Sequence, residues 1–386
     1  MGNKSTLSGF LLVVALAGLW QAVIGPFIGA LGLFRTIRPL RNDNCQIRSD
    51  LDGCEKFVLD HETGLLYMAC VESASRSRWL PNMRALDASG MVNGTIVTYN
   101  ADTSEVTRLN VVGGNFAQGF SLHGFDVVRS ATNATELYFY MINHRTPRQG
   151  DAWKVGADSV IEILKGADGS RTLEHVMTVQ DPIIMTPNEV VGTADGKGFW
   201  FTNDHGSKTD WTREIEMFFP IPTTSVGYCH VDFGCKIAAD RTTSSNGLAW
   251  DRSADLFYVG STPRGTIGLY GRLPDNTLAY KDSVTLGEVM DNLDVDSEGT
   301  LWAATFPSGV KVLKRFRDTI TDAPSAAWRI KFDNVTAASG GNHEAEKIFE
   351  DDGTVVGVAT SVVHDVERSL LYLHGLTSRQ FAVCKI

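Results

Sequence analysis

Short hydrophobic runs, joined in pairs by tight turns, recur along most of this chain. In each pair, a run that opens on a polar residue is followed by a turn, such as 62–64 or 297–299, and then by a second run rich in leucine and aromatic residues. This pattern predicts β-hairpins. The first runs open at Glu55, His123, Asn188, Asn246, Asp291 and Thr360, and the second runs at Leu65, Leu137, Phe199, Leu256, Leu301 and Leu370.

Six such hairpins in one stretch of chain predict an all-β protein, a six-bladed β-propeller in which small sheets pack radially around a channel. The irregular spacing of the hairpins indicates long loops between the blades. We expect two parts: a hydrophobic leader with a basic stem at 1–41, and the propeller at 42–386.

The leader, from Leu7 to Phe34, is long and apolar enough to span a bilayer as an N-terminal hydrophobic helix. An uncleaved signal anchor is the first interpretation, and a cleaved signal peptide with a site near Ala15–Ala17 is the alternative. Arg35, Arg38 and Arg41 follow the segment and slightly oppose a lumenal C-terminal part, because basic residues favour the cytosolic side.

The polar residues that open the hairpins suggest a site. In a propeller they converge at one mouth of the channel, where Glu55, Asn188, Asn246, Asp291 and Asn292 offer two carboxylates and three amide oxygens and no thiolate. Hard oxygen donors of this kind favour calcium over zinc or copper. His123 opens the second hairpin and His144 follows its second strand, so the two imidazoles are candidates to handle a proton. The alternative is that polar residues at strand starts only cap turns.

Several short motifs along the propeller carry a family resemblance. They are His123-Gly124, Asn143-His144, Pro187-Asn188, Thr202-Asn203-Asp204-His205, Ser245-Asn246-Gly247, Met290-Asp291-Asn292 and the terminal Cys384. Together they resemble the serum paraoxonase/arylesterase family from about Cys45 to the C-terminus. The resemblance implies a calcium-dependent six-bladed propeller that hydrolyses lactones and aryl esters. With the leader near a membrane, we expect a small lipophilic ester or lactone as the substrate.

The resemblance also implies roles for particular residues. The five oxygen donors would hold a catalytic calcium, and His123 with His144 would form the proton-handling pair. Asn203, Asp204 and His205 would lie on the pocket wall. Phe306 stands where relatives carry a histidine, which predicts a more apolar wall.

One departure from the family concerns a second, structural calcium ion. Family members have an acidic pair where this chain has Glu55-Lys56, and Asn-Asp where it has Asn188-Glu189. Because an ammonium cannot coordinate calcium, we expect Lys56 to pair with Glu189 in place of the second ion, leaving one calcium per chain.

Six cysteines suggest an oxidising compartment. A bridge between Cys45 and Cys384 would tie the ends of the ring together, and the family resemblance implies the same pair. Cys229 and Cys235 could close a short loop, which leaves Cys54 and Cys70 on adjoining strands of one hairpin. Free buried thiols are the alternative, and a zinc site at 229–235 lacks a fourth ligand.

Charge and sequons complete the prediction. A net charge of −10 gives no electrostatic basis for nucleic-acid binding. Asn93, Asn133 and Asn334 begin glycosylation sequons, so we expect a lumenal or extracellular protein that is membrane-anchored, or secreted if the leader is cleaved. The alternatives to a hydrolase are a strictosidine synthase-like propeller enzyme and a catalytically silent binding propeller.

Overall fold

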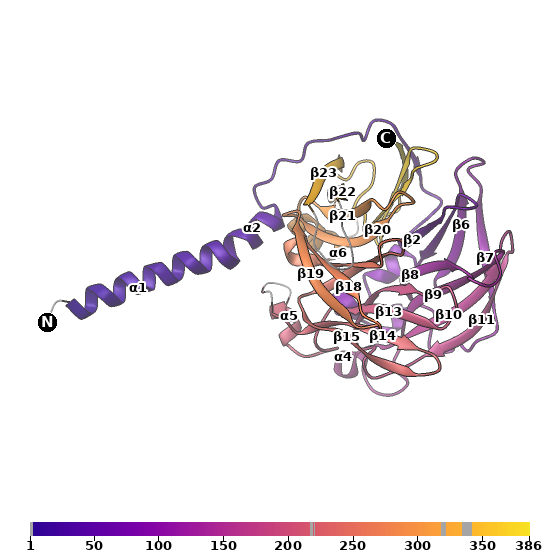
Figure 1. Cartoon of the computed structure of the whole chain (residues 1–386), viewed down its shortest axis with the longest axis horizontal. Helices are drawn as coiled ribbons and strands as arrows, with labels where there is room; N and C mark the ends of the chain where they lie inside the picture. The colour runs from indigo at the N-terminus through magenta and orange to yellow at the C-terminus, as the bar shows by residue number, and fades with distance from the viewer. Residues whose placement is uncertain (1–2, 217–218, 220, 318–321, 334–341) are drawn as a thin grey trace.

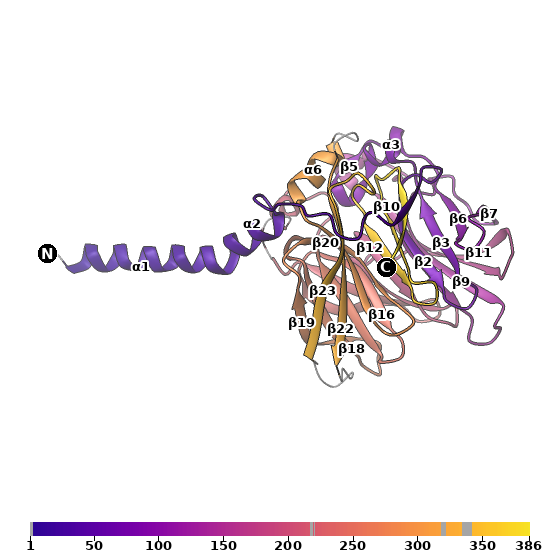
Figure 2. The same cartoon turned by 90° about the horizontal axis from the view of Figure 1, so that it is seen from above.

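The propeller accounts for most of the chain. The computed structural model describes residues 3–216, 219, 221–317, 322–333 and 342–386. Within these residues the strands form six blades around a central axis, and a long N-terminal helix projects away from them (Figure 1, Figure 2). The prediction of an all-β, six-bladed propeller with an N-terminal hydrophobic helix is confirmed.

Each blade has four strands, and the first strand lies nearest the axis. Blade 1 contains β2 (Cys54–Asp60), β3 (Leu65–Cys70), β6 (Thr95–Asn100) and β7 (Val106–Val112). Blade 2 contains β8 (Leu122–Arg129), β9 (Glu136–Arg145), β10 (Asp158–Ala167) and β11 (Thr172–Val179). Blade 3 contains β12 (Pro187–Gly192), β13 (Gly198–Asn203), β14 (Thr224–His230) and β15 (Gly234–Thr242).

The other three blades complete the ring. Blade 4 contains β16 (Ser245–Asp251), β17 (Leu256–Ser261), β18 (Thr266–Arg272) and β19 (Leu278–Thr285). Blade 5 contains β20 (Val289–Val295), β21 (Leu301–Phe306), β22 (Ser325–Asp333) and β23 (Asn342–Asp351). Blade 6 contains β24 (Ser361–Asp365), β25 (Leu370–His374), β26 (Phe381–Lys385) and β1 (Cys45–Arg48).

Blade 6 closes the ring because it takes its outer strand from the start of the propeller. β1 pairs with β26, and Cys45 lies opposite Cys384, to which it is bonded. The structure also contains the other two disulfides that the sequence predicts, Cys54–Cys70 and Cys229–Cys235. At the outside, β7 and β11 pair in parallel and join blades 1 and 2 into one eight-stranded sheet.

The hydrophobic core lies between neighbouring blades. Between blades 1 and 6, Tyr99 stacks edge-on against Phe381 with ring centroids 5.1 Å apart, and Phe57 and Tyr372 are buried beside them. Strands covered on both faces by adjacent blades need apolar residues on both sides. This explains why the second strands are so rich in leucine and aromatic residues.

Insertions between the second and third strands all lie on one face of the ring, because the second strands of all blades run in the same direction. Blade 1 carries α3 (Ser73–Arg76), β4 (Trp79–Leu80), η2 (Pro81–Met83), β5 (Ala85–Leu86) and η3 (Ala88–Gly90). Blades 2 to 5 carry α4 (Ala152–Val155), α5 (Thr212–Glu216), η4 (Thr262–Arg264) and α6 (Gly309–Arg317). The first strands begin at this same face.

The N-terminal segment is a helix with a π-helical turn in it: α1 (Asn3–Leu19), η1 (Trp20–Ile24) and α2 (Gly25–Leu31). Leu11–Leu31 is the one span among the described residues that is long and apolar enough to cross a membrane. At its end, Gly32 adopts φ +62° against blade 5, where a Cβ atom would lie 1.9 Å from the carbonyl oxygen of Pro307. Arg35 then forms an ion pair of 3.0 Å with Glu288 and donates to the carbonyl oxygen of Gly287, so α2 is fixed to the propeller.

Candidate active site

Five inner strands carry the expected site residues, and each strand is interrupted at that point. The register of pairing with the second strand shifts across Glu55, across His123, across Asn188, across Asn246, and across Asp291 with Asn292. A β-bulge of this kind turns a side chain away from its regular alternation. The pairing of β24 in blade 6 is regular, and its neighbouring Thr360 donates to the backbone carbonyl of Glu55 at 2.8 Å.

The bulges direct these side chains into one cavity of about 150 Å³ at the mouth of the channel. Glu55, His123, Asn188, Asn246 and Asp291 line it, and Asn292 lies directly behind, where its Nδ2 donates to Glu55 Oε1 at 2.6 Å. The structure therefore brings together residues that lie more than two hundred positions apart in the sequence.

Several polar atoms of this cluster have no hydrogen-bond partner among the residues that the structure describes. Buried oxygens without a hydrogen-bond partner occur on four of these residues, at Glu55 Oε2, Asn188 Oδ1, Asn246 Oδ1 and Asn292 Oδ1. Unpaired buried oxygens are costly, and several at one place call for a cation. Burial and the negative charge of the neighbouring Glu55 also raise the pKa of Asp291 well above its ordinary value. Both effects reflect carboxylates gathered in a buried place. The described residues contain no group of three acidic, histidine or cysteine side chains suited to a metal, so the amide oxygens are essential to any cation site here.

His123 and His144 lie next to each other, with ring centroids 5.1 Å apart. Ser159 Oγ is 2.8 Å from His144 Nδ1, and Asn188 Nδ2 is 3.5 Å from His123 Nε2. Burial, with the charges of His144 and Arg76, lowers the pKa of His123 well below its ordinary value. Burial also lowers the pKa of His144 to about 3, so both rings are neutral near pH 7.

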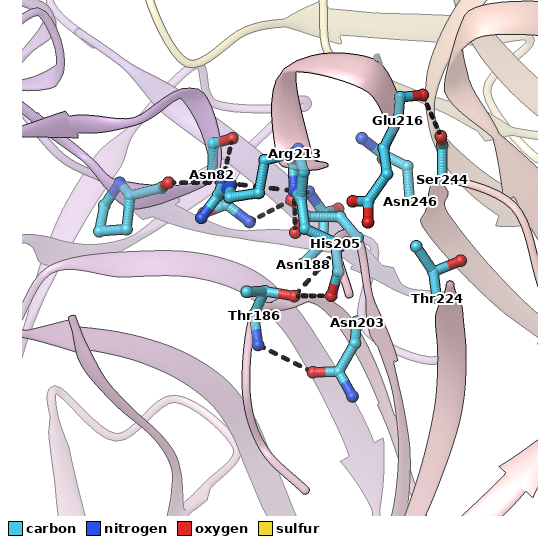
Figure 3. A network of polar contacts seen from close by, with 12 residues as sticks. Asn82, Thr186, Asn188, Asn203, His205, Arg213, Glu216, Thr224, Ser244 and Asn246 are labelled. Atoms are coloured by element: carbon cyan, nitrogen blue, oxygen red, sulfur yellow. Dashed lines mark hydrogen bonds and ion pairs between the residues drawn. The ribbon is translucent and has the colours of Figure 1, made fainter. Parts of the chain in front are cut away.

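A second polar group contacts Asn188 through Asp204 (Figure 3). Asp204 Oδ1 is 2.7 Å from His205 Nδ1, and Asp204 Oδ2 accepts a hydrogen bond of 2.6 Å from Asn82 Nδ2. Arg213, in α5, donates to the carbonyl oxygens of Pro81 and Asn82. Asn82 and Arg213 were not predicted from the sequence; the only signal for them is that both belong to insertions after second strands.

Asn203 is the one predicted wall residue that does not line the cavity. Its Oδ1 accepts hydrogen bonds from the backbone N–H groups of Met185 and Thr186, so it supports the loop before β12 instead. Successive side chains in an extended chain point to opposite sides, and Asp204 faces the cavity while Asn203 faces away. Asp204, His205 and Phe306 do line the cavity.

The rest of the wall is apolar and comes from separate parts of the chain. Phe306 is buried at the end of β21 and is joined by residues of α2, η2 and α6. These are Phe27, Leu31, Met83, Val312 and Leu313, and Leu80 of β4 lies with them. The end of the membrane-span candidate is thus part of the cavity wall.

Lys56 points away from this cavity into the channel, next to Glu55. Its Nζ lies 3.1 Å from Glu189 Oε2 and donates to the carbonyl oxygen of Leu293 at 2.7 Å. Burial lowers the pKa of Lys56, but the charges of Glu189, Asp294 and Glu55 and the hydrogen bond to Glu189 together outweigh burial, and the pKa is raised overall. The ammonium of β2 is therefore held between oxygens of two other inner strands, β12 and β20.

The sequons lie away from the cavity where they are described. Asn93 and Asn133 are exposed, and Asn133 lies in the turn between β8 and β9, at the opposite face. Asn334 lies outside the described residues.

Comparisons of the sequence with known proteins show which family the chain belongs to. The arylesterase family model matches residues 55–385. Serum paraoxonase/arylesterase 1 of Homo sapiens is 22% identical over 332 residues, which is 86% of each chain. Serum paraoxonase/lactonase 3 of Oryctolagus cuniculus is 22% identical over 355 residues, covering 91% of this chain and 93% of that protein. Because the family model spans nearly the whole propeller, the chain belongs to the arylesterase family.

Proposed function

We propose that this protein is a calcium-dependent hydrolase of lactones and aryl esters. Membership of the arylesterase family supports a hydrolase of the lactonase or esterase type. The observation that carries the proposal is the set of unpaired buried oxygens that the bulged inner strands direct into one cavity beside two neutral histidines.

Glu55, Asn188, Asn246, Asp291 and Asn292 would hold the calcium ion. Two carboxylates and three amide oxygens match the ligands that calcium prefers. When bound, the ion would polarise the substrate carbonyl and stabilise negative charge on its oxygen.

The two histidines of the cavity would handle the proton of the attacking water. His123 lines the cavity and is neutral near pH 7, so it can accept a proton. His144 is tethered through Nδ1 to Ser159, and its buried Nε2 has no partner, so it is positioned to share that proton.

The apolar wall and the N-terminal helix support a lipophilic substrate met at a membrane. Three disulfides with an apolar N-terminal helix fit a secreted or membrane-anchored protein. We propose an uncleaved anchor with the propeller in the lumenal or extracellular space. Since Phe27 and Leu31 belong to the span candidate and line the cavity, the cavity mouth would lie at the membrane surface.

We also propose that the ammonium of Lys56 takes the place of a second cation. It already contacts the oxygens of Glu189 and Leu293, and a second ion there would meet a positive charge. Metal analysis of the purified protein should give one calcium per chain, and two tightly held ions would contradict this.

The test of the function is hydrolysis of γ- and δ-lactones and phenyl acetate by the full chain in detergent, with calcium and then with a chelator. We expect turnover that requires calcium and falls by about 10²-fold or more in His123→Gln and in Asp291→Ala. Folded, calcium-loaded protein that turns over none of these substrates would instead favour a non-hydrolytic or binding role.

A further inference from the structure

His205 is the one histidine lining the cavity that is hydrogen-bonded to a carboxylate, among the residues the structure describes. Its backbone is fixed as well, since its N–H donates to Thr186 Oγ1 at 3.1 Å and its carbonyl accepts from the same hydroxyl at 2.8 Å. The ring is partly exposed, with 13% of the side chain accessible, so a molecule in the cavity can reach it.

The hydrogen bonds around Asp204 define which ring nitrogen carries a proton. Asp204 Oδ2 accepts from Asn82 Nδ2 at 2.6 Å and from Asn188 Nδ2 at 3.3 Å, so the carboxylate acts as an acceptor. Its Oδ1 must then accept from Nδ1–H of His205 at 2.7 Å. No hydrogen bond from the described residues reaches Nε2, and that nitrogen remains for the contents of the cavity.

Arg213 adds a positive charge next to this ring. Its Nη2 lies 3.3 Å from His205 Nδ1 while it donates to the carbonyl oxygens of Pro81 and Asn82. Asp204 and Arg213 both contact Nδ1, so they fix the orientation of the ring and leave Nε2 for the cavity. A proton-bearing group held in one orientation beside the substrate is what general acid catalysis needs.

His123 and His144 have a different environment. No carboxylate contacts either ring among the described residues, and both rings are buried against each other. Asn188 links the two sets, because its Nδ2 contacts both His123 and Asp204. The cavity thus has two histidine groups, and only that of His205 has a carboxylate hydrogen-bonded to the ring.

We propose that His205 is the general acid of the reaction: its Nε2, which faces the cavity, takes up a second proton from solvent and gives it to the leaving oxygen of the substrate. This rests on the proposed hydrolase function. Water adds to the carbonyl carbon and its proton passes to His123. The bond between the carbonyl carbon and the leaving oxygen then breaks, the electron pair stays on that oxygen, and the oxygen takes the proton of protonated His205. Exchange with solvent returns both histidines to their starting states, and the net reaction is ester plus water giving acid plus alcohol.

The test compares leaving groups that differ in their need for a proton. A lactone releases an alkoxide, which must be protonated, whereas 4-nitrophenyl acetate releases a stable phenolate. In His205→Gln we expect kcat/KM to fall by about 10²-fold or more for δ-valerolactone and by less than about threefold for 4-nitrophenyl acetate. Across substituted phenyl acetates, the variant should depend more steeply on the pKa of the leaving phenol than the wild type does.

His364→Gln is the matched control, because His364 Nδ1 pairs with Asp296 at 2.8 Å outside the cavity, and it should show no such selectivity. Asp204→Asn is the second variant if His205→Gln fails to fold, as judged by circular dichroism. It should show the same selectivity to a smaller degree.

An equal fall for both substrates in folded His205→Gln, or no fall for the lactone, overturns the general-acid role while the hydrolase function stands. Wild-type protein inactive on every ester would overturn both.

Discussion

At the residue scale, the channel of this protein contains buried oxygens at two successive levels. The levels differ in whether a positively charged side chain contacts these oxygens. At the mouth, buried oxygens of Glu55, Asn188, Asn246 and Asn292 have no hydrogen-bond partner in the described part of the chain. One residue further along β2, the ammonium of Lys56 contacts Glu189 and Leu293. The first level would need a cation from solution beside its oxygens, whereas the ammonium of Lys56 supplies the positive charge at the second level.

The Lys56–Glu189 pair makes a direct prediction for stability. Lys56→Met leaves the Glu189 carboxylate buried without a cation, so the free energy of unfolding should fall by about 3–5 kcal/mol. Lys56→Met combined with Glu189→Gln should recover most of that loss, since neither charge of the pair then remains buried. Denaturant unfolding of the three proteins in detergent measures this, and an unchanged midpoint for Lys56→Met would contradict it.

A buried histidine predicts loss of stability in acid. Burial lowers the pKa of His374 in β25 to about 3, below the ordinary value of 6.5. The unfolded chain therefore takes up a proton first as the pH falls below about 6.5, and stability is lost from there down to about pH 3, by up to about 1.4 kcal/mol per pH unit. In His374→Asn the side-chain oxygen can still accept the N–H of Gly375. The slope of unfolding free energy against pH should be shallower by about one proton, and identical slopes would rule this out.

At the element scale, the bulges of the inner strands determine the site. Gly124 and Gly247 follow two of the bulged residues, and a Cβ atom at either would collide with the neighbouring inner strand. The absence of a side chain therefore lets β8 approach β12 and β16 approach β20, which brings the oxygens of neighbouring strands together.

Gly247→Ala tests this close approach. Its Cβ would lie 2.6 Å from the carbonyl oxygen of Asp291 and 2.8 Å from the N–H nitrogen of Leu293. The two strands must separate, so we expect a loss of about 1–3 kcal/mol in stability and weaker calcium binding by calorimetry. Gly357→Ala is the control, because its nearest neighbours are 3.7 Å away. Equal effects of the two substitutions would show that the strand approach is unimportant.

At the scale of the whole molecule, a closed ring needs its two ends to be joined. Blade 6 takes β1 from the N-terminal part and pairs it with β26 at the C-terminus, and the Cys45–Cys384 disulfide between them spans 339 positions. The Cys229–Cys235 disulfide spans 6. Chain entropy makes the long closure more stabilising than the short one.

Replacing each pair with serines measures this difference. The chain-entropy model gives about 6 kcal/mol for the long loop and about 2 kcal/mol for the short one. We therefore expect a larger fall in Tm for Cys45→Ser with Cys384→Ser than for Cys229→Ser with Cys235→Ser. The opposite order would mean that the strand pairing of β1 closes the ring without help from the disulfide.

The sequence by itself determined the architecture and most of the oxygen cluster. Hairpins and their alternation are local, so six repeats could be recognised, and equivalent positions in repeats must lie at one level of the ring. That reasoning places Glu55, Asn188, Asn246 and Asp291 at one mouth, where they line one cavity. Cys54 and Cys70 could be paired for the same reason, because they lie on adjoining strands of one hairpin.

Only the tertiary structure decided what surrounds the cluster. Asn82, Arg213 and α2 come from segments without a repeating pattern, and their position depends on packing against other insertions rather than on local alternation. The same reason explains Asn203, whose motif placed it on the wall although its strand turns it away. The hydrogen bond from Asn82 to Asp204, the carboxylate beside His205, joins residues of blades 1 and 3, so it exists only once these blades have assembled.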